Sequence, residues 1–288
     1  MYQISQLHID IARNATDDFN LFHDRYRWQW VKDNPFNGPI ALGFQLGLFI
    51  ESQIKSVPDH KNIFLPFTTY EFNFANPVRV DDVIHVELKK SRESETEQGK
   101  MISQRVCLKV NGKPAIIGFK RDSEYSPLPN NFESYTPEKL SEYKDRTFIQ
   151  DNVFLKRKWM IVGNAKNFLL STHADQTIFI DEFADKVDFP QMYPLSLISS
   201  ALLERAQAIN HDLIANPQIY VSHHLCIDNI QLAKLRSNDC LQMLVKQVSG
   251  DNTEQSCLQV CGWVNQEQPL FIAELKLASL QMILKPQA

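Results

Sequence analysis

The order of hydrophobic patterns along the chain constrains its fold more than any other feature. A mostly apolar segment, Pro39–Ile54, predicts a helix and is followed by four runs in which apolar and polar residues alternate. The same order returns after a second helix candidate, Leu195–Asn210. Alternation with a period of two predicts antiparallel strands with one buried face, and helices that are apolar on nearly all sides predict burial against such sheets. The chain therefore predicts two copies of one α+β unit.

The connections between these elements repeat as well. Arg79 and Asp82 precede a strand after a bend, and Arg236 and Asp239 do the same 157 residues later. Between the two copies lies a segment rich in Pro, Ser, Asn and charge, which predicts a linker with one short helix. We therefore expect a first domain at residues 1–125, a linker at 126–150 and a second domain at 151–288.

Composition excludes several classes of function. The chain has 30 basic and 34 acidic side chains, so it lacks the basic excess that would follow a phosphate backbone, and we expect no nucleic-acid partner. The N-terminal residues lack the pattern of a signal peptide, and the apolar runs are too short or too interrupted for membrane insertion. The five cysteines lack metal-binding spacing, so we interpret them as reduced thiols and expect no metal. Together these features predict a soluble, cytoplasmic protein.

A polar cluster precedes the first helix candidate. The stretch "ATDDFNLFHD", Ala15–Asp24, is followed by "GPIALG", Gly38–Gly43. This pair of motifs is similar to the signature of the MaoC-like, R-specific enoyl-CoA hydratases, which reads Asp-x-Asn-Pro-x-His and then Gly-Pro-Ile-Ala-His-Gly. The matching residues are Asp18, Asn20, His23 and Gly43. Leu21 replaces the proline of the family motif, and Leu42 replaces the histidine before the last glycine.

The second half resembles another branch of the same fold, the β-hydroxyacyl-ACP dehydratases. The stretch "DFPQMYPLSLISSALLERAQA" is similar to their His-Phe-Pro-Gly segment followed by a glutamate-bearing central helix. Asp188 stands where that family has its histidine, and Ser200 stands where it has its glutamate. Glu204, one helical turn further on, is a candidate for a displaced substitute. The two resemblances together imply a double hotdog fold whose C-terminal half is a scaffold without its own chemistry.

The first resemblance also implies a reaction and a set of roles. The family hydrates 2-enoyl thioesters or dehydrates 3-hydroxyacyl thioesters, with CoA or acyl carrier protein as the handle and without a cofactor. Asp18 and His23 would be the catalytic groups that move protons through one bound water. The backbone N–H of Gly43 would stabilise the thioester oxygen, and Asn20 would contact the substrate. The resemblance further implies a possible homodimer of double hotdog chains.

Two other interpretations compete with this one. Asp17 or Asp18 would simply turn the loop, because Asp readily bonds to nearby backbone groups, and His23 would be an ordinary half-buried histidine. As a function, a hotdog acyl thioesterase would use a carboxylate-activated water, and a non-catalytic acyl-thioester-binding subunit would use the pocket alone.

The His223–His224 pair is another candidate for chemistry. Strand alternation places the two rings on opposite faces of a strand, so the pair cannot chelate a metal. We therefore interpret both rings as polarity at a surface or a strand edge.

Overall fold

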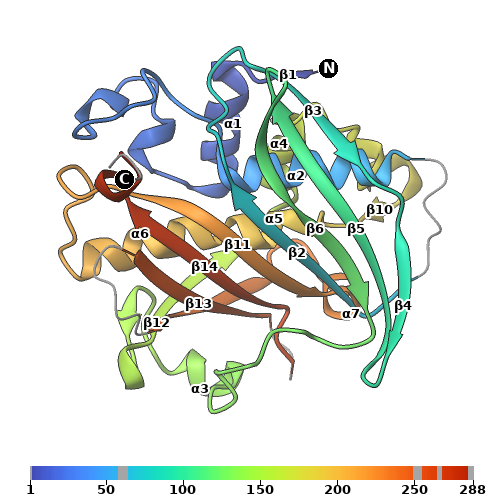
Figure 1. Ribbon diagram of the computed structural model, residues 1–288. Coiled ribbons are helices and arrows are strands. Elements are labelled where there is room, and N and C mark those ends of the chain that lie inside the picture. Colours follow the sequence, from blue (N-terminus) through green and yellow to red (C-terminus); the bar gives the residue numbers. More distant parts are fainter. Residues whose placement is uncertain (1, 58–63, 249–254, 265–267, 285–288) are drawn as a thin grey trace.

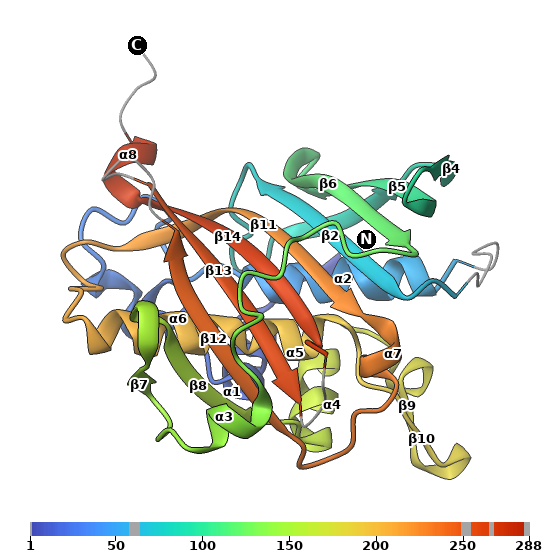
Figure 2. The same cartoon turned by 90° about the horizontal axis from the view of Figure 1, so that it is seen from below.

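The computed structural model describes residues 2–57, 64–248, 255–264 and 268–284. In these residues a 12-stranded antiparallel sheet runs in the order β1-β3-β5-β6-β2-β11-β14-β13-β12-β8-β7, with β4 paired to β5. The central helices of the two repeats lie against one face of this sheet (Figures 1 and 2). This is the α+β, double hotdog architecture that the sequence predicts: two repeats, each with a central helix wrapped by antiparallel strands.

The first repeat places its central helix, α2, inside the curve of its strands. The elements are β1 (Tyr2–Gln3), α1 (Gln6–Thr16), α2 (Gly43–Lys55), β2 (Phe67–Phe74), β3 (Val83–Leu88), β4 (Arg92–Thr96), β5 (Gly99–Val110) and β6 (Lys113–Ser123). In β2, Tyr70 and Phe72 are buried, whereas Glu71 lies between them on the opposite face and pairs with Arg121. The alternating pattern of the sequence therefore sorts side chains between the helices and the outer face.

The second repeat has the same order, with its central helix divided in two. The elements are β7 (Thr147–Phe148), β8 (Phe154–Trp159), α4 (Val162–Leu170), β9 (Ile180–Asp181), β10 (Lys186–Val187), α5 (Met192–Ser196), α6 (Ile198–Ala208), β11 (Gln218–Asp228), α7 (Asn229–Leu232), β12 (Cys240–Val248), β13 (Gln255–Val264), β14 (Phe271–Ser279) and α8 (Leu280–Leu284). Along the sheet, the strands of the second repeat follow the order of the corresponding strands of the first repeat in reverse. The two repeats meet at β2 and β11, which pair antiparallel. The halves thus form one continuous sheet, and the pairing of β2 with β11 covers a strand edge of each half that would otherwise be exposed.

The bend before a strand repeats at the level of atoms. The N–H of Arg79 donates to Asp82 Oδ2 at 2.7 Å, and the N–H of Arg236 donates to Asp239 Oδ2 at 2.7 Å. The repeat inferred from the sequence offset is therefore a repeated hydrogen-bonded turn.

Both central helices differ from their predicted limits. Helix α2 begins at Gly43 rather than Pro39, because Ile40 forms a bridge with Arg79. The second helix is interrupted between α5 and α6, where the hydroxyls of Ser196 and Ser200 donate to carbonyls one turn back. Such bonds bend helices.

The segment between the repeats contains the short helix that its sequence predicts, α3 (Pro137–Ser141). Phe132, Tyr135 and Leu140 are buried there in a second cluster with residues of β8, β12 and β13. The linker therefore covers part of the outer face of the second repeat. The sequence also predicts a polar turn that ends in Pro269 between the last two strands, and residues 265–267 of that turn lie outside the described residues.

Helices α1 and α4 are elements that the hydrophobic pattern did not reveal. Each follows a strand at its repeat's edge of the sheet, and the two helices pack on one another. Ser5 caps α1 by accepting from the N–H of His8, and Ile9, Ala12 and Ala15 form its buried face. The small residues on this face give a weak hydrophobic signal.

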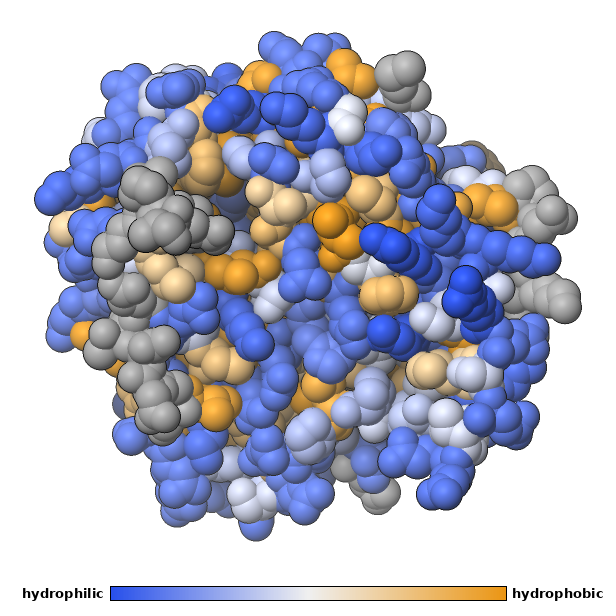
Figure 3. All heavy atoms as spheres, viewed as in Figure 1, coloured by the Kyte–Doolittle hydropathy of each residue, from blue (hydrophilic) through white to orange (hydrophobic). Residues whose placement is uncertain are grey.

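The outer surface is mixed in character. Figure 3 shows the face of Figure 1 covered mainly by hydrophilic residues, with hydrophobic residues between them. No helix among the described residues has the length and apolar character needed to cross a membrane.

Candidate active site

The turn after α1 decides which of two adjacent acids faces inward. Asp17 has left-handed backbone angles, with φ of 54°, and its exposed side chain pairs with Lys158. Asp18 then turns back into the protein, where only 4% of it is exposed, and its N–H donates to the carbonyl of Arg13 at 3.0 Å. Asp at a left-handed position ends the helix at low cost and re-aims the next residue.

Three short hydrogen bonds hold the motif residues in place. Asp18 Oδ1 accepts from the N–H of Asn20 at 2.9 Å, and Asn20 Oδ1 accepts from the N–H of Phe22 at 3.1 Å. The Asn20 bond caps the 3₁₀ turn Leu21–His23. His23 Nδ1 lies 2.7 Å from the carbonyl oxygen of Ile40. Because a carbonyl only accepts, Nδ1 carries the proton, and Nε2 of the neutral ring is left as an acceptor.

Burial keeps His23 in this neutral form. Burial lowers the pKa of His23 below its ordinary value, and the nearby charge of Asp18 and the Ile40 bond only partly oppose that effect. The imidazole therefore stays neutral, with a free Nε2 lone pair, at neutral pH.

Gly43 is the first residue of α2, so its N–H has no acceptor within the helix. A Cβ at this position would lie 3.0 Å from the ring of Phe74 and 3.3 Å from Cε1 of His223. Glycine thus lets the rings of Phe74 and His223 pack closely against the start of α2, which borders the cavity described next.

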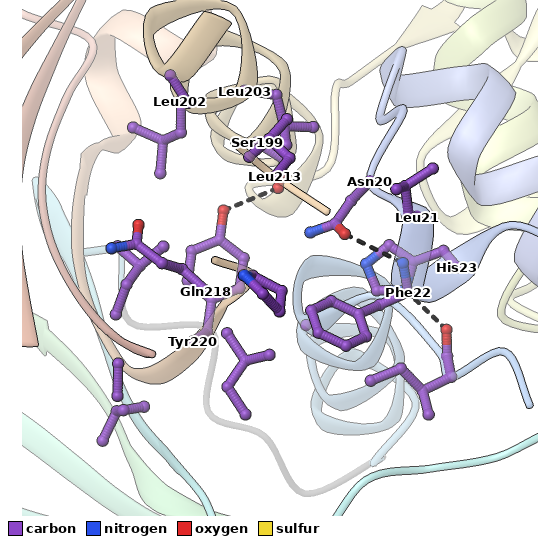
Figure 4. Close-up of a pocket in the computed structure, with 18 of the residues that line it drawn as sticks. Asn20, Leu21, Phe22, His23, Ser199, Leu202, Leu203, Leu213, Gln218 and Tyr220 are labelled. Carbon is purple, nitrogen blue, oxygen red and sulfur yellow. Dashed lines mark hydrogen bonds between the residues drawn. The ribbon is translucent and has the colours of Figure 1, made fainter. Parts of the chain in front are cut away.

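These residues border a cavity of about 980 Å³. Asn20, His23 and Gly43 line it, whereas Asp18 is buried and is not among the residues of the wall. Most of the remaining wall is apolar and comes from both halves (Figure 4), including Phe22, Leu46, Leu202, Leu203, Leu213 and Ile219. The geometry thus places an imidazole with a free nitrogen and a helix start in the wall of a chamber that suits an acyl chain, and the buried Asp18 lies close enough for its charge to act on His23.

The second half contributes a polar group that the sequence did not reveal. In Figure 4 the hydroxyl of Tyr220 faces Ser199 of α6, and the two oxygens are 3.1 Å apart. Burial, and then the charge of Asp18, raise the pKa of Tyr220 well above its ordinary value. Asp18 therefore acts on a side chain of the other repeat.

His223 corrects one expectation. Its neighbour His224 lies on the opposite face beside Glu71, as alternation predicts, but the ring of His223 is only 1% exposed, so it is not surface polarity. The ring stacks on Phe44 and touches Tyr220 edge-on with centroids 4.5 Å apart in each case. Burial lowers the pKa of His223 to about 3, so the ring is neutral.

The candidate positions of the second half lie outside the cavity wall. The side chain of Asp188 is 66% exposed, and Ser200 is buried with its hydroxyl donated to Leu197. Glu204, the candidate for a displaced glutamate, pairs with Lys156 and Arg146, each at 3.0 Å. Its carboxylate therefore anchors α6 to β8 and the linker.

At the start of α5, the counterpart of the helix start at Gly43, a buried acid binds the backbone N–H groups. Glu51 of α2 is 1% exposed, and its two carboxylate oxygens accept from the N–H groups of Gln191 and Met192 at 2.9 Å. The N–H of Gly43 has no acceptor within its helix, whereas the N–H groups at the start of α5 already bind Glu51.

The part of the chain that is described holds no group of three or more His, Cys, Asp and Glu side chains placed to bind a metal ion.

No family model and no curated protein matches the chain. Solved structures do. A MaoC-like dehydratase is 12% identical with a TM-score of 0.62, and the alignment covers 96% of this chain and 95% of that one. A conserved hypothetical protein from Mycobacterium tuberculosis, described as having a double hotdog fold, is 12% identical with a TM-score of 0.61, covering 96% and 93%.

The peroxisomal multifunctional enzyme type 2 from Drosophila melanogaster is 10% identical with a TM-score of 0.56. The alignment covers 96% of this chain and 47% of that longer one. The chain therefore has the double hotdog fold of MaoC-like dehydratases.

Proposed function

We propose that the protein hydrates 2-enoyl thioesters to (R)-3-hydroxyacyl thioesters, or catalyses the reverse dehydration, with the N-terminal repeat carrying the chemistry. The observation that supports this most is the placing of His23 and Gly43 in the wall of an acyl-sized cavity, with the buried Asp18 close enough for its charge to act on His23. We further propose that residues 1–125 are the catalytic unit, 126–150 the linker and 151–288 a unit that completes the cavity.

The proposed reaction needs one water and no cofactor. The carboxylate of Asp18 and Nε2 of His23 hold the water, whose oxygen bonds to Cβ of the enoyl group. The π electrons move toward the thioester oxygen, which the N–H of Gly43 stabilises. The proton lost by the water passes through the Asp18–His23 pair and forms the new bond at Cα, so that water is added and nothing else is consumed. Asn20 holds the turn through its bond to Phe22 and presents its side chain to the substrate.

Product analysis tests this proposal against its main competitor. With crotonyl-CoA and longer trans-2-enoyl-CoA substrates, we expect loss of the enoyl absorbance, no free thiol and an (R)-3-hydroxyacyl product. Release of thiol at the rate of substrate loss would instead make the protein a thioesterase. Binding of a non-hydrolysable acyl thioester without turnover of any of these substrates would make it a binding subunit.

A further inference from the structure

Strand β11 of the second repeat carries an irregularity beside the cavity. Its pairing with β14 shifts register between Tyr220 and Ser222, which places a bulge at Val221. Residues three apart on a regular strand point to opposite faces, yet the rings of Tyr220 and His223 touch, with centroids 4.5 Å apart. The bulge therefore turns Tyr220 onto the inner face, and such bulges commonly re-aim a side chain at an active site.

The Tyr220 ring is held from two sides. His223 packs edge-on against it, and the ring of Phe44 also lies edge-on to it with ring centroids 6.1 Å apart. The phenol oxygen is 3.1 Å from Ser199 Oγ, at a point where α6 borders the cavity. The hydroxyl is thus fixed in position rather than free to rotate into solvent.

The hydroxyl of Tyr220 lies within reach of the charge of Asp18, which belongs to the other repeat. Tyr220 lines the cavity, and the charge of Asp18 reaches it through space. In Figure 4 the ring lies across the cavity from Asn20 and His23. A group placed between the Asp18–His23 pair and Tyr220 would meet polar atoms from both repeats.

We propose that Tyr220 is a further catalytic residue, whose hydroxyl donates a hydrogen bond to the oxygen that is added to, or removed from, Cβ. The inference rests on the hydratase function proposed above. Ser199 acts as a positioning residue: its O–H donates to the phenol oxygen, so the phenol O–H is directed at the substrate. Because Tyr220 stays protonated, it remains a donor throughout the working pH range.

This assignment gives the second repeat a chemical part in the reaction. The water is then held by two acceptors from the first repeat and one donor from the second. Three fixed contacts define the face of the enoyl group that the oxygen attacks, which suits a stereospecific addition.

Tyr220→Phe removes one oxygen and leaves the ring, so it tests the proposal directly. We expect kcat to fall about 10²- to 10³-fold, as for loss of one preorganised donor, with KM within about twofold. Ser199→Ala should lower kcat by less. Tyr193→Phe is the matched control, because Tyr193 is also buried and donates to the carbonyl of Ile161 but does not line the cavity.

The assay includes Asp18→Asn so that two kinds of failure are distinct. If wild type is active, Asp18→Asn is impaired and Tyr220→Phe matches wild type, the role of Tyr220 is overturned and the hydratase function stands. If Tyr220→Phe raises KM without lowering kcat, its hydroxyl serves binding alone and the proposal also fails. If wild type hydrates no enoyl thioester, the proposed function fails and this inference fails with it.

Discussion

The two repeats contain a similar backbone turn, but its side chains differ. After α1, the N–H of Asp18 bonds to the carbonyl five residues back, at Arg13, and after α4 the N–H of Ala174 bonds to Leu169 in the same way. A 3₁₀ turn follows in each case, capped by Asn20 in the first repeat and by Asp175 in the second. The backbone design is thus conserved between the halves while the chemistry is not.

The side chains that the two turns present differ at each chemical position. By its hydrogen bond to the carbonyl five residues back, Ala174 stands at the position of Asp18. The second turn has one residue fewer before its cap, and counted from the cap, Ile178 stands at the position of His23. Both repeats have a capping residue, because a cap satisfies backbone donors that every such turn contains. Only the first repeat has an acid and an imidazole at these two positions, as we expect where these groups serve a function rather than the fold.

The starts of the two central helices differ in a complementary way. At α5 the carboxylate of Glu51 occupies the N–H groups of Gln191 and Met192, whereas near Gly43 the facing helix presents Ser199 and leaves a cavity. One repeat is therefore closed by a side chain from the other, and the open repeat retains room for a thioester.

The largest effect that would break this comparison is loss of the acid or the imidazole from the first turn. Asp18→Asn keeps the shape but removes the carboxylate, and His23→Ala removes the ring, so each should lower kcat about 10²- to 10⁴-fold in an enoyl-thioester hydration assay. Because both groups act on one water, the double variant should lose far less than the product of the two single losses.

Asp17→Asn is the control for this pair, since its side chain is exposed and pairs with Lys158 outside the cavity. Its activity should stay near wild type, with melting temperatures measured for all variants. An inactive Asp17→Asn beside an active Asp18→Asn would show that the motif has been assigned one residue out of register. Wild-type activity in every variant would reduce the cluster to a polar loop.

Much of the fold could be predicted from the sequence, because hydrophobic alternation and the Arg-x-x-Asp bends are local patterns, and the motif spacing named the residues of the candidate site. The bulge that re-aims Tyr220 and the contact of Glu51 with α5 could not, since each depends on how two repeats meet. His223 was misjudged for the same reason: its position on β11 was right, but the aromatic rings around it come from α2 and β2. Local pattern thus fixes elements, while sites across the pseudo-dimer depend on packing.

The next largest effect concerns the closed helix start. Glu51→Ala would leave the buried N–H groups of Gln191 and Met192 without their acceptor, at a cost of about 1–3 kcal/mol for each. We expect a lower free energy of unfolding by about 2–6 kcal/mol in urea titrations, with kcat unchanged below the melting transition. Glu51→Gln keeps one acceptor oxygen and should lose less. An unchanged stability in Glu51→Ala would show that these bonds do not hold the second repeat closed.

The pH dependence of the reaction rate should follow the protonation of His23. Below the pKa of His23, kcat/KM should fall about tenfold for each pH unit. Because burial lowers the pKa of His23, kcat/KM should hold constant as the pH falls past 6.5, and should decline only below that lowered pKa, where Nε2 becomes protonated. The same shift acts on stability: the unfolded chain takes up the proton first, so this part of the stability is complete above about pH 6.5 and is lost below it. An acid limb centred at or above pH 6.5 would contradict a buried, neutral His23.

The smallest effects are expected at the motif positions of the second repeat, and they test whether that repeat lacks chemistry of its own. Asp188 is exposed, with Lys186 no closer than 4.0 Å, so Asp188→Ala should leave both activity and stability near wild type. Ser200→Ala loses the bond to Leu197, worth about 1 kcal/mol, while activity should stay within twofold of wild type. Parallel rate and melting measurements separate these outcomes. If either variant abolished turnover in a folded protein, the reacting groups would lie in the C-terminal repeat, and the assignment of open and closed halves would be reversed.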